Sequence, residues 1–232
     1  MLAAVLYVPR LFSSYRTWIF MKENDMNKKL DKKRNIDFYL LYTAAFLAVA
    51  LALYLRFFTN GKSLVWSHDG VPQHLNSLAY YGRYLRQVLY TLFIEHKLSL
   101  PLWDMHIGYG SDILTTLHYY VIGDPLTLLA VFVPESKTET LYAFLIFLRI
   151  YLAGIAFSRY SFYHKNSKQA TFMGTMIYIF AGWTIYAAMK HPYFSNPMIY
   201  LPLILLGIDK IYKKEKPYTF IWSVALAGLS NF

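Results

Sequence analysis

Several apolar stretches of this chain are long enough to cross a lipid bilayer, and that length constrains the fold more than any other feature. The first runs from Phe38 to Phe58, and further stretches fall near residues 141–163, 171–189 and 193–212. About 20 apolar residues in a helix span a hydrocarbon core of about 30 Å. Charged residues make up 16% of the 232 residues, against about 25% in a typical soluble domain. We therefore expect an all-α, polytopic transmembrane helical bundle.

The basic residues predict how these helices are oriented. Lys22–Arg34 carries six Lys or Arg, and Lys213-Lys214-Glu215-Lys216 is a second basic cluster. Basic loops face the cytoplasm, so the loop that follows the first span should lie outside the cell. The net charge of the chain is +10, but the basic residues sit in short clusters between apolar spans, so nucleic-acid binding is not expected. Alternation of sides then gives five spans, at residues 37–58, 141–163, 171–189, 193–212 and a last, truncated one from 218.

The chain divides into a short N-terminal part and a transmembrane domain. Residues 1–36 should form an N-terminal extension and a basic cytoplasmic segment, in which Met1–Asp25 is expected to be poorly packed. Residues 37–232 should form the transmembrane domain. The last apolar run has no polar end, so we expect the sequence to be the N-terminal part of a longer protein. Cysteine is absent, which excludes a disulfide framework and thiolate metal sites in this chain.

The large outer loop should contain amphipathic and broken helices. Pro72 suits the first turn of a helix, and the apolar residues after it recur at helical spacing with Arg83 and Arg86 between them. This pattern favours a helix that lies on the membrane surface. The apolar segment 113–133 is interrupted by Gly123-Asp124-Pro125, and proline cannot continue the helical hydrogen-bond ladder. Two short half-helices are therefore expected there.

The stretch Ser67-His68-Asp69-Gly70-Val71-Pro72-Gln73 carries chemistry at the point where the first span leaves the membrane. Together with His74 it supplies a carboxylate, two imidazoles and an amide. A carboxylate held there can act as a general base on a lipid-linked substrate. The alternative is that Asp69 caps the helix that begins near Pro72, and the residues alone favour this capping role.

The order of several motifs resembles the YfhO family of bacterial membrane proteins, which has the layout of GT-C glycosyltransferases. The motifs are Trp66–Gln73, Leu100–Asp104, Ile107–Asp112, Asp124-Pro125, His191-Pro192 and Leu201–Asp209. The resemblance begins at about residue 37 and covers the N-terminal part of such a protein. It implies a glycosyltransferase that takes a sugar from a polyprenyl-phosphate donor, notably undecaprenyl phosphate, and adds it to a surface polymer such as lipoteichoic acid outside the cell.

With this resemblance, catalysis by Asp69 becomes the favoured role, and other polar residues become candidate substrate contacts. Gln73 could bond a sugar hydroxyl, orient the carboxylate or lie on a solvated helix face. Arg149 needs an anionic partner, because an arginine in hydrocarbon costs at least about 2.5–3.5 kcal/mol. That partner is either the phosphate of the lipid carrier or an aspartate of the outer loop. The remaining candidates are Trp103, which could stack on a sugar, Asp104, Asp124 and His191.

Metal binding and two other classes of function stay open. A divalent metal would fit, because His and Asp side chains can bind one, although their spacing matches no recognisable metal motif. A transporter or flippase of a lipid-linked envelope precursor would need polar residues along a path through the spans. A non-catalytic scaffold of envelope-assembly enzymes would tolerate the loss of Asp69.

Overall fold

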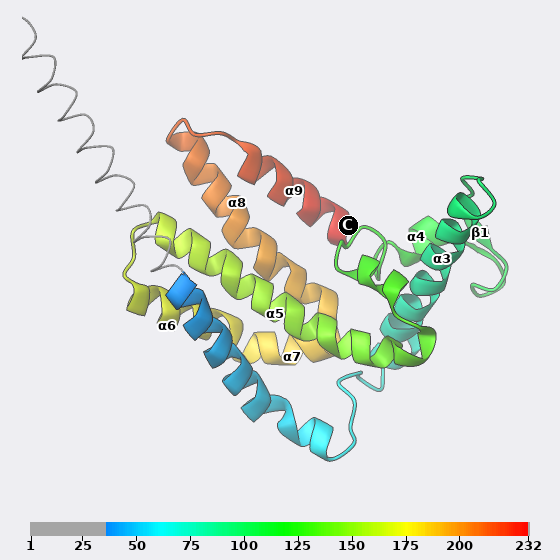
Figure 1. Ribbon diagram of the computed structural model, residues 1–232, viewed down its shortest axis with the longest axis horizontal. Helices are drawn as coiled ribbons and strands as arrows, with labels where there is room; N and C mark the ends of the chain where they lie inside the picture. The colour runs from blue at the N-terminus through cyan, green and yellow to red at the C-terminus, as the bar shows by residue number, and fades with distance from the viewer. Residues whose placement is uncertain (1–35, 232) are drawn as a thin grey trace, which may run out of the picture. The chain divides into compact units, whose positions relative to one another are not determined.

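The computed structural model describes residues 36–231, and their elements are almost all helical (Figure 1). The elements are the helix Ile36–Thr59, η1 (Gly70–Leu75), α3 (Asn76–Phe93), β1 (Trp103–Asp104), β2 (Ser111–Asp112), α4 (Ile113–Leu117), η2 (Thr127–Phe132), η3 (Glu135–Lys137), α5 (Thr138–Tyr163), α6 (Lys168–Ile179), α7 (Gly182–Lys190), η4 (Pro192–Ser195), α8 (Asn196–Tyr212) and α9 (Tyr218–Asn231). The η elements are short turns of π- or 3-10 helix. Within these residues the extended structure is one antiparallel pair of two-residue strands. The expected all-α class is confirmed.

The N-terminal extension and its basic cluster, expected over residues 1–36, lie almost entirely outside the described residues. The chain divides into two compact units, and the boundary between them lies within the first helix, between Val49 and Ala50. All contacts described below lie within the second unit, which begins at Ala50.

Fewer helices than expected have the length of a full membrane crossing. Ile36–Thr59 and the segment Glu135–Tyr163, which contains α5, are long and apolar enough, and α6 with α7 forms a third candidate that bends by 44°. α8 has 17 residues, and at about 1.5 Å per residue it is shorter than a hydrocarbon core of about 30 Å. α9 is shorter still within the described residues. Residues 36–231 therefore hold two or three candidate spans where five were expected.

Local backbone chemistry explains two of the interruptions. Ala181 has an extended backbone between α6 and α7, and Gly182, a poor helix former, opens α7. α7 ends at Lys190 because the residue before a proline is pushed out of the helical region. That residue, His191, has φ −133° and ψ 85° and precedes Pro192. A hydropathy window averages over the break at Ala181, so residues 171–189 were expected to be continuous, whereas the break at His191-Pro192 falls between two expected spans.

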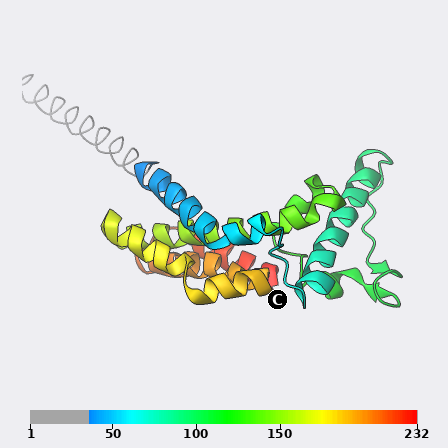
Figure 2. The ribbon, with the colours of Figure 1, turned by 90° about the horizontal axis from the view of Figure 1, so that it is seen from below.

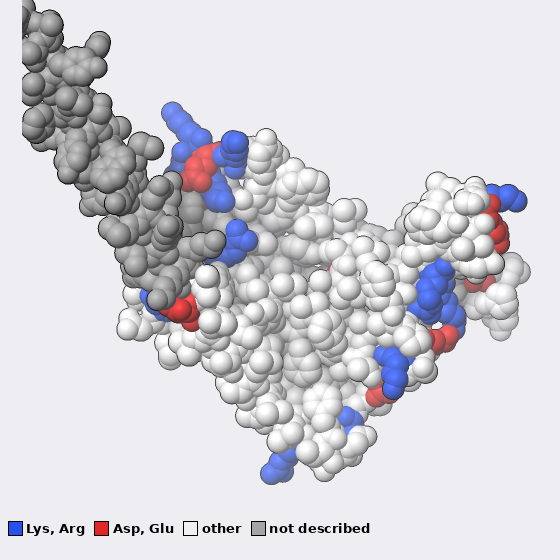
Figure 3. Space-filling model, viewed as in Figure 1, with Lys and Arg blue, Asp and Glu red and all other residues white. Residues whose placement is uncertain are grey.

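The surface of the helices is suited to lipid. Large apolar side chains are exposed along α5, α6 and α8, among them Phe144, Ile177 and Leu201. Soluble monomers rarely expose broad contiguous apolar patches. Figure 3 shows Lys and Arg gathered over the turn between α8 and α9, with uncharged atoms covering most of the length of α5 and α8. This distribution agrees with helices that lie in a membrane.

The amphipathic helix expected after Pro72 is present as η1 followed by α3. Leu78 and Tyr81 are buried on one face of α3. A Cβ on Gly82 would lie 2.8 Å from the carbonyl oxygen of Ala130, so this face packs closely against η2. Figures 1 and 2 both show α3 and the strand pair beyond the end at which α5 begins.

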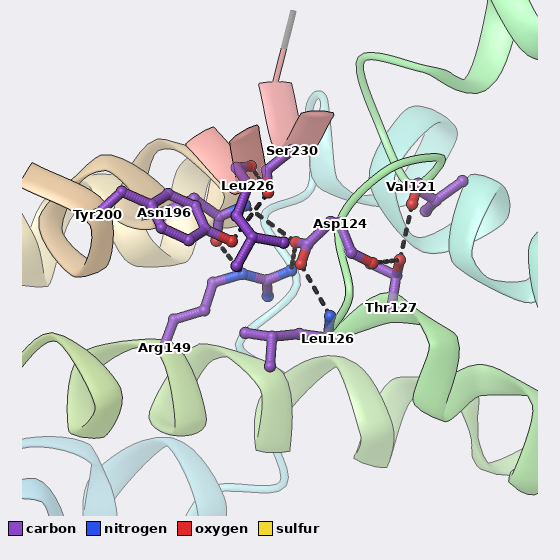
Figure 4. A network of polar contacts seen from close by, with 9 residues as sticks. All are labelled: Val121, Asp124, Leu126, Thr127, Arg149, Asn196, Tyr200, Leu226 and Ser230. Carbon is purple, nitrogen blue, oxygen red and sulfur yellow. Dashed lines mark hydrogen bonds and ion pairs between the residues drawn. The ribbon is translucent and has the colours of Figure 1, made fainter. Parts of the chain in front are cut away.

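The expected break at Gly123-Asp124-Pro125 is also present, with α4 before it and η2 after it. Gly123 has φ +94°, a conformation that favours glycine, and a Cβ there would lie 1.9 Å from the carbonyl oxygen of Leu229 in α9. Only glycine lets this turn approach the α9 backbone so closely. The turn directs the side chain of Asp124 toward α5 and α8 (Figure 4).

A buried ion pair joins this turn to α5 and α8. Arg149 Nη2 donates to Asp124 Oδ2 at 2.6 Å, and both side chains are 1% exposed. Asn196 Nδ2 donates to the same oxygen at 3.0 Å, while Asn196 Oδ1 accepts from Arg149 Nε at 2.8 Å. The backbone N–H of Leu126 donates to Asp124 Oδ1 at 2.9 Å (Figure 4). These hydrogen bonds satisfy the charges that burial removes from solvent.

Breaking this pair should destabilise the fold strongly. Asp124→Asn keeps the shape of the side chain but leaves the Arg149 charge buried without its counter-ion, which costs about 3–5 kcal/mol. We expect a clearly lower apparent melting temperature for the detergent-solubilised protein. Asp112→Asn is the matched control, since it removes one charge from an exposed helix cap where Asn serves nearly as well as Asp. Equal melting temperatures for the two variants would contradict the role of the pair.

Candidate functional site

Three side chains from two distant segments meet beside η1, and we refer to them as the Asp69–His191–His74 cluster. His74 Nε2 and His191 Nδ1 are 3.1 Å apart. His191 Nε2 lies 3.8 Å from Asp69 Oδ2. Asp69 and His74 stand at opposite ends of one π-helical turn, which the hydrogen bond from the His74 N–H to the Asp69 carbonyl closes. His191 comes from the corner between α7 and η4, where the following proline has ended the helix.

Burial decides which histidine donates the hydrogen bond between His74 and His191. His74 is fully buried, and within the described residues its Nδ1 has no hydrogen-bond partner. A buried N–H without an acceptor is costly, so the proton of His74 sits on Nε2 and is donated to His191 Nδ1. His191 then carries its own proton on Nε2, the nitrogen that faces Asp69.

The lowered pKa of His74 agrees with a neutral ring that donates one N–H to His191. Burial, and after it the neighbouring His191, lowers the pKa of His74 to about 4. Arg149 acts in the same direction and Asp69 opposes it. His74 is therefore neutral at pH 7 and has a single N–H to donate.

Asp69 does not act as a helix cap in this geometry. It occupies the position before η1, but its side chain makes no capping hydrogen bond. Its Oδ1 instead accepts from Gln73 Nε2 at 3.0 Å, and Gln73 Oε1 accepts from the Tyr120 hydroxyl at 2.9 Å. Gln73 thus contacts the carboxylate, as one of the roles considered for it requires. The Asp69 side chain is 39% exposed and accessible to a ligand.

Aromatic rings wall the cluster. The Trp66 ring stacks on the His68 ring with centroids 5.0 Å apart and meets the His191 ring edge-on at 5.8 Å. Lys190 Nζ lies 4.5 Å from the centroid of Trp66. On the other side, the Tyr193 ring packs against His74 at 5.4 Å. Beside these rings the side chains of Asp69 and His191 remain 39% and 29% exposed, so the accessible edge of the cluster is polar.

Two other candidates, Trp103 and Asp104, line a separate cleft of about 450 Å³. The Tyr80 hydroxyl donates to Asp104 Oδ2 at 2.6 Å, and His106 donates its backbone N–H to Oδ1 at 2.8 Å. These bonds, led by that of Tyr80, lower the pKa of Asp104 to about 2. Trp103 is 60% exposed beside it. The cleft therefore combines an exposed indole with a carboxylate that stays ionised.

The remaining candidates, Asp124 and Arg149, form the buried ion pair and lie behind the Tyr193 ring as seen from His74. Two partners were considered for Arg149, and in the structure it pairs with the aspartate, Asp124. The Arg149 side chain is only 1% exposed, so it cannot contact the phosphate of a lipid carrier. The guanidinium lies 5.0 Å from the centroid of the Tyr193 ring, which in turn packs on His74. The ion pair therefore supports the wall of the cluster and does not face its accessible edge.

Several members of the site were not singled out by sequence reasoning. His74 was noted as an imidazole near Asp69 but had no assigned role, yet it is the fully buried centre of the cluster. Trp66, Tyr120 and Lys190 had no assigned role. The contacts of the site join positions far apart in the chain, such as His74 and His191 with a sequence separation of 117, so no local pattern marks these residues. Among residues 36–231, no group of three or more His, Cys, Asp or Glu is arranged to hold a metal ion.

The buried His74 should make the protein sensitive to acid. In the unfolded chain a histidine binds a proton below about pH 6.5, whereas folded His74 stays neutral down to about 4, so stability is lost as pH falls through this window. The loss is at most roughly 3 kcal/mol. The apparent melting temperature should fall from pH 7 to 4.5 in the wild type and change less in His74→Gln. His118→Gln is the control and should keep the wild-type slope; a wild-type slope in His74→Gln would refute the assignment.

Comparison with known proteins places the chain in a family. A family model described as Bacterial membrane protein YfhO matches residues 41–232. A protein of Bacillus subtilis (strain 168) with the name "Uncharacterized protein YfhO" is 25% identical over 211 residues, which cover 83% of this chain and 23% of the relative. The chain thus spans about a quarter of the length of that relative. No solved structure matches the chain. Since the family match takes in most of the sequence, the chain belongs to the YfhO family of bacterial membrane proteins.

Proposed function

We propose that the chain is part of a membrane glycosyltransferase that moves a sugar from a polyprenyl-phosphate donor to a cell-surface polymer. The observation that carries the proposal is the Asp69 carboxylate, which is accessible, held by Gln73 and faced by the N–H of His191. By the positive-inside rule, the loop with Asp69 lies on the outer face of the membrane. A surface polymer of the lipoteichoic acid type is accessible on that face.

In this reaction a hydroxyl oxygen of the acceptor attacks the anomeric carbon of the donor sugar. The bond between that carbon and the phosphate oxygen breaks, and polyprenyl phosphate leaves. The hydroxyl proton passes to Asp69 as the general base. His191 Nε2 and Asp69 Oδ2 are 3.8 Å apart, too far for a direct hydrogen bond, so an acceptor hydroxyl placed between them could contact both.

The environments of the three candidate carboxylates favour Asp69 as the base. Asp124 is buried in an ion pair and does not contact solvent. Asp104 accepts hydrogen bonds from Tyr80 and His106 that hold its pKa at about 2, which makes it a weak base at neutral pH. Asp69 has an accessible carboxylate and one side-chain donor, Gln73.

The cleft of Trp103 and Asp104 is suited to hold part of the acceptor polymer. Aromatic rings offer apolar faces on which sugars stack, and Trp103 stands beside Tyr80 and Tyr84 in this cleft. An ionised Asp104 accepts hydrogen bonds from hydroxyl groups. Gln87 and Arg83 add donors to the same wall.

Asp69→Asn should abolish sugar transfer while leaving the protein in the membrane. The amide keeps the size of the side chain but is a far weaker proton acceptor, and loss of a general base costs about 10²–10⁴-fold in rate. The measurement is sugar content of the surface polymer in a strain that lacks the native copy, with protein abundance checked in the same membranes. Asp112→Asn, which makes the same charge change in the same loop, should retain decoration.

Unchanged decoration in Asp69→Asn would exclude the carboxylate as base. The transporter or flippase and the scaffold of envelope-assembly enzymes would then become the better explanations of the fold.

Trp103→Ala should weaken acceptor binding more than it slows the chemical step. Loss of one stacking ring removes about 0.5–1.5 kcal/mol of contact energy. We therefore expect the KM for isolated polymer to rise by up to roughly tenfold, while kcat stays similar. Tyr109→Ala is the control, because Tyr109 lies in the same loop and is fully exposed. An equal effect of the two substitutions would show that the cleft does not bind the acceptor.

A further inference from the structure

A second groove shares Trp66 with the surroundings of the Asp69–His191–His74 cluster. It has a volume of about 490 Å³ and lies between the end of the first helix and the end of α7. Its lining combines two lysines, Lys62 and Lys190, with apolar side chains that include Phe57, Leu64 and Met189. We infer that this groove binds the phosphate headgroup of a membrane lipid.

The charges of the groove favour an anion. Lys62 and Lys190 line it together, and no Asp or Glu does. Within residues 36–231, neither lysine forms an ion pair with a carboxylate. Lys190 Nζ lies 4.5 Å from the centroid of Trp66 and 4.2 Å from that of Tyr186, and it donates to the Tyr186 hydroxyl. An ammonium group has three donors, so at least one is available for a phosphate oxygen.

The position of the groove favours a lipid over a soluble anion. Phe57 belongs to the last turn of the helix Ile36–Thr59, and Met189 to the last turn of α7, the second arm of the bent pair. Both elements have the apolar composition of membrane spans. Basic side chains at such helix ends attract anionic headgroups, while the apolar lining is suited to the first carbons of a lipid tail. A hydrated inorganic ion gains nothing from Phe57 and Leu64.

The groove also stands close to the candidate catalytic carboxylate. Trp66 lines it and also contacts the ring of His191. Ser67, which also lines the groove, is two residues before Asp69. That the lipid is the sugar donor rests on the proposed function. In that case Lys62 and Lys190 bind the donor phosphate, a role for which Arg149 is too deeply buried.

Binding can be measured without any transfer reaction. The intact protein in phosphatidylcholine nanodiscs is titrated with a fluorescent polyprenyl phosphate, with unlabelled polyprenyl phosphate, polyprenol and inorganic phosphate as competitors. We expect polyprenol to compete at least about tenfold more weakly than polyprenyl phosphate, since it lacks the charged group that the lysines contact. Lys62→Gln with Lys190→Gln should weaken phosphate-lipid binding at least about tenfold and remove most of the preference over polyprenol.

Matched variants separate this site from general charge effects. Lys97→Gln with Lys213→Gln makes the same change in net charge. Lys213, like Lys190, has its ammonium over a tyrosine ring, at 4.1 Å from the centroid of Tyr163. This pair should bind like the wild type. Equal losses in both double variants, or competition by inorganic phosphate at the concentrations at which the lipid competes, would overturn the proposal.

A third variant separates this proposal from the proposed function. Asp69→Asn should bind polyprenyl phosphate normally, because the carboxylate does not line the groove. Normal binding together with normal decoration in Asp69→Asn would refute the catalytic role and leave the lipid site standing. Loss of decoration in Asp69→Asn, with unchanged lipid binding in the Lys62 and Lys190 variants, would refute the lipid site alone.

Discussion

The buried ion pair between Asp124 and Arg149 is the interaction on which the arrangement of the second unit depends. It joins the turn after α4 to α5, and Asn196 extends it to the first residue of α8. A charge removed from solvent is tolerated only when its partners are held in place, so these three elements must come together for any of them to pack. Through the Tyr193 ring the pair also supports His74, and hence the cluster at Asp69.

The three candidate carboxylates have three different environments, which is why different roles are proposed for them. Asp124 is buried and paired, which makes it structural. Asp104 is held ionised by Tyr80 and His106 in an open cleft, which suits binding. Asp69 is accessible, and its neighbour His191 directs an N–H toward it because His74 is buried with a single proton. The same type of side chain is thus buried and paired, ionised in an open cleft, or accessible beside an imidazole within one loop region.

Sequence reasoning predicted what depends on local chemistry. The helical class, the amphipathic helix after Pro72 and the break at Gly123-Asp124-Pro125 follow from periodicity and backbone constraints, and all are present. Fewer helices than expected have the length of a full crossing, because α6 and α7 bend near Ala181 and because α8 and α9 are short. Arg149 was known to need an anion, but choosing between Asp124 and a phosphate required the tertiary contact. Asp69 and His191 were each named as candidates, but the tertiary contact between them could not be predicted from either local sequence.

The bend between α6 and α7 decides where α7 ends. At Ala181 the extended backbone interrupts the helix, so α7 takes a direction 44° away from that of α6. Its other end bears Lys190 in the groove and is followed at once by His191 in the cluster. One short helix therefore places both the lysine of the groove and the imidazole that faces Asp69.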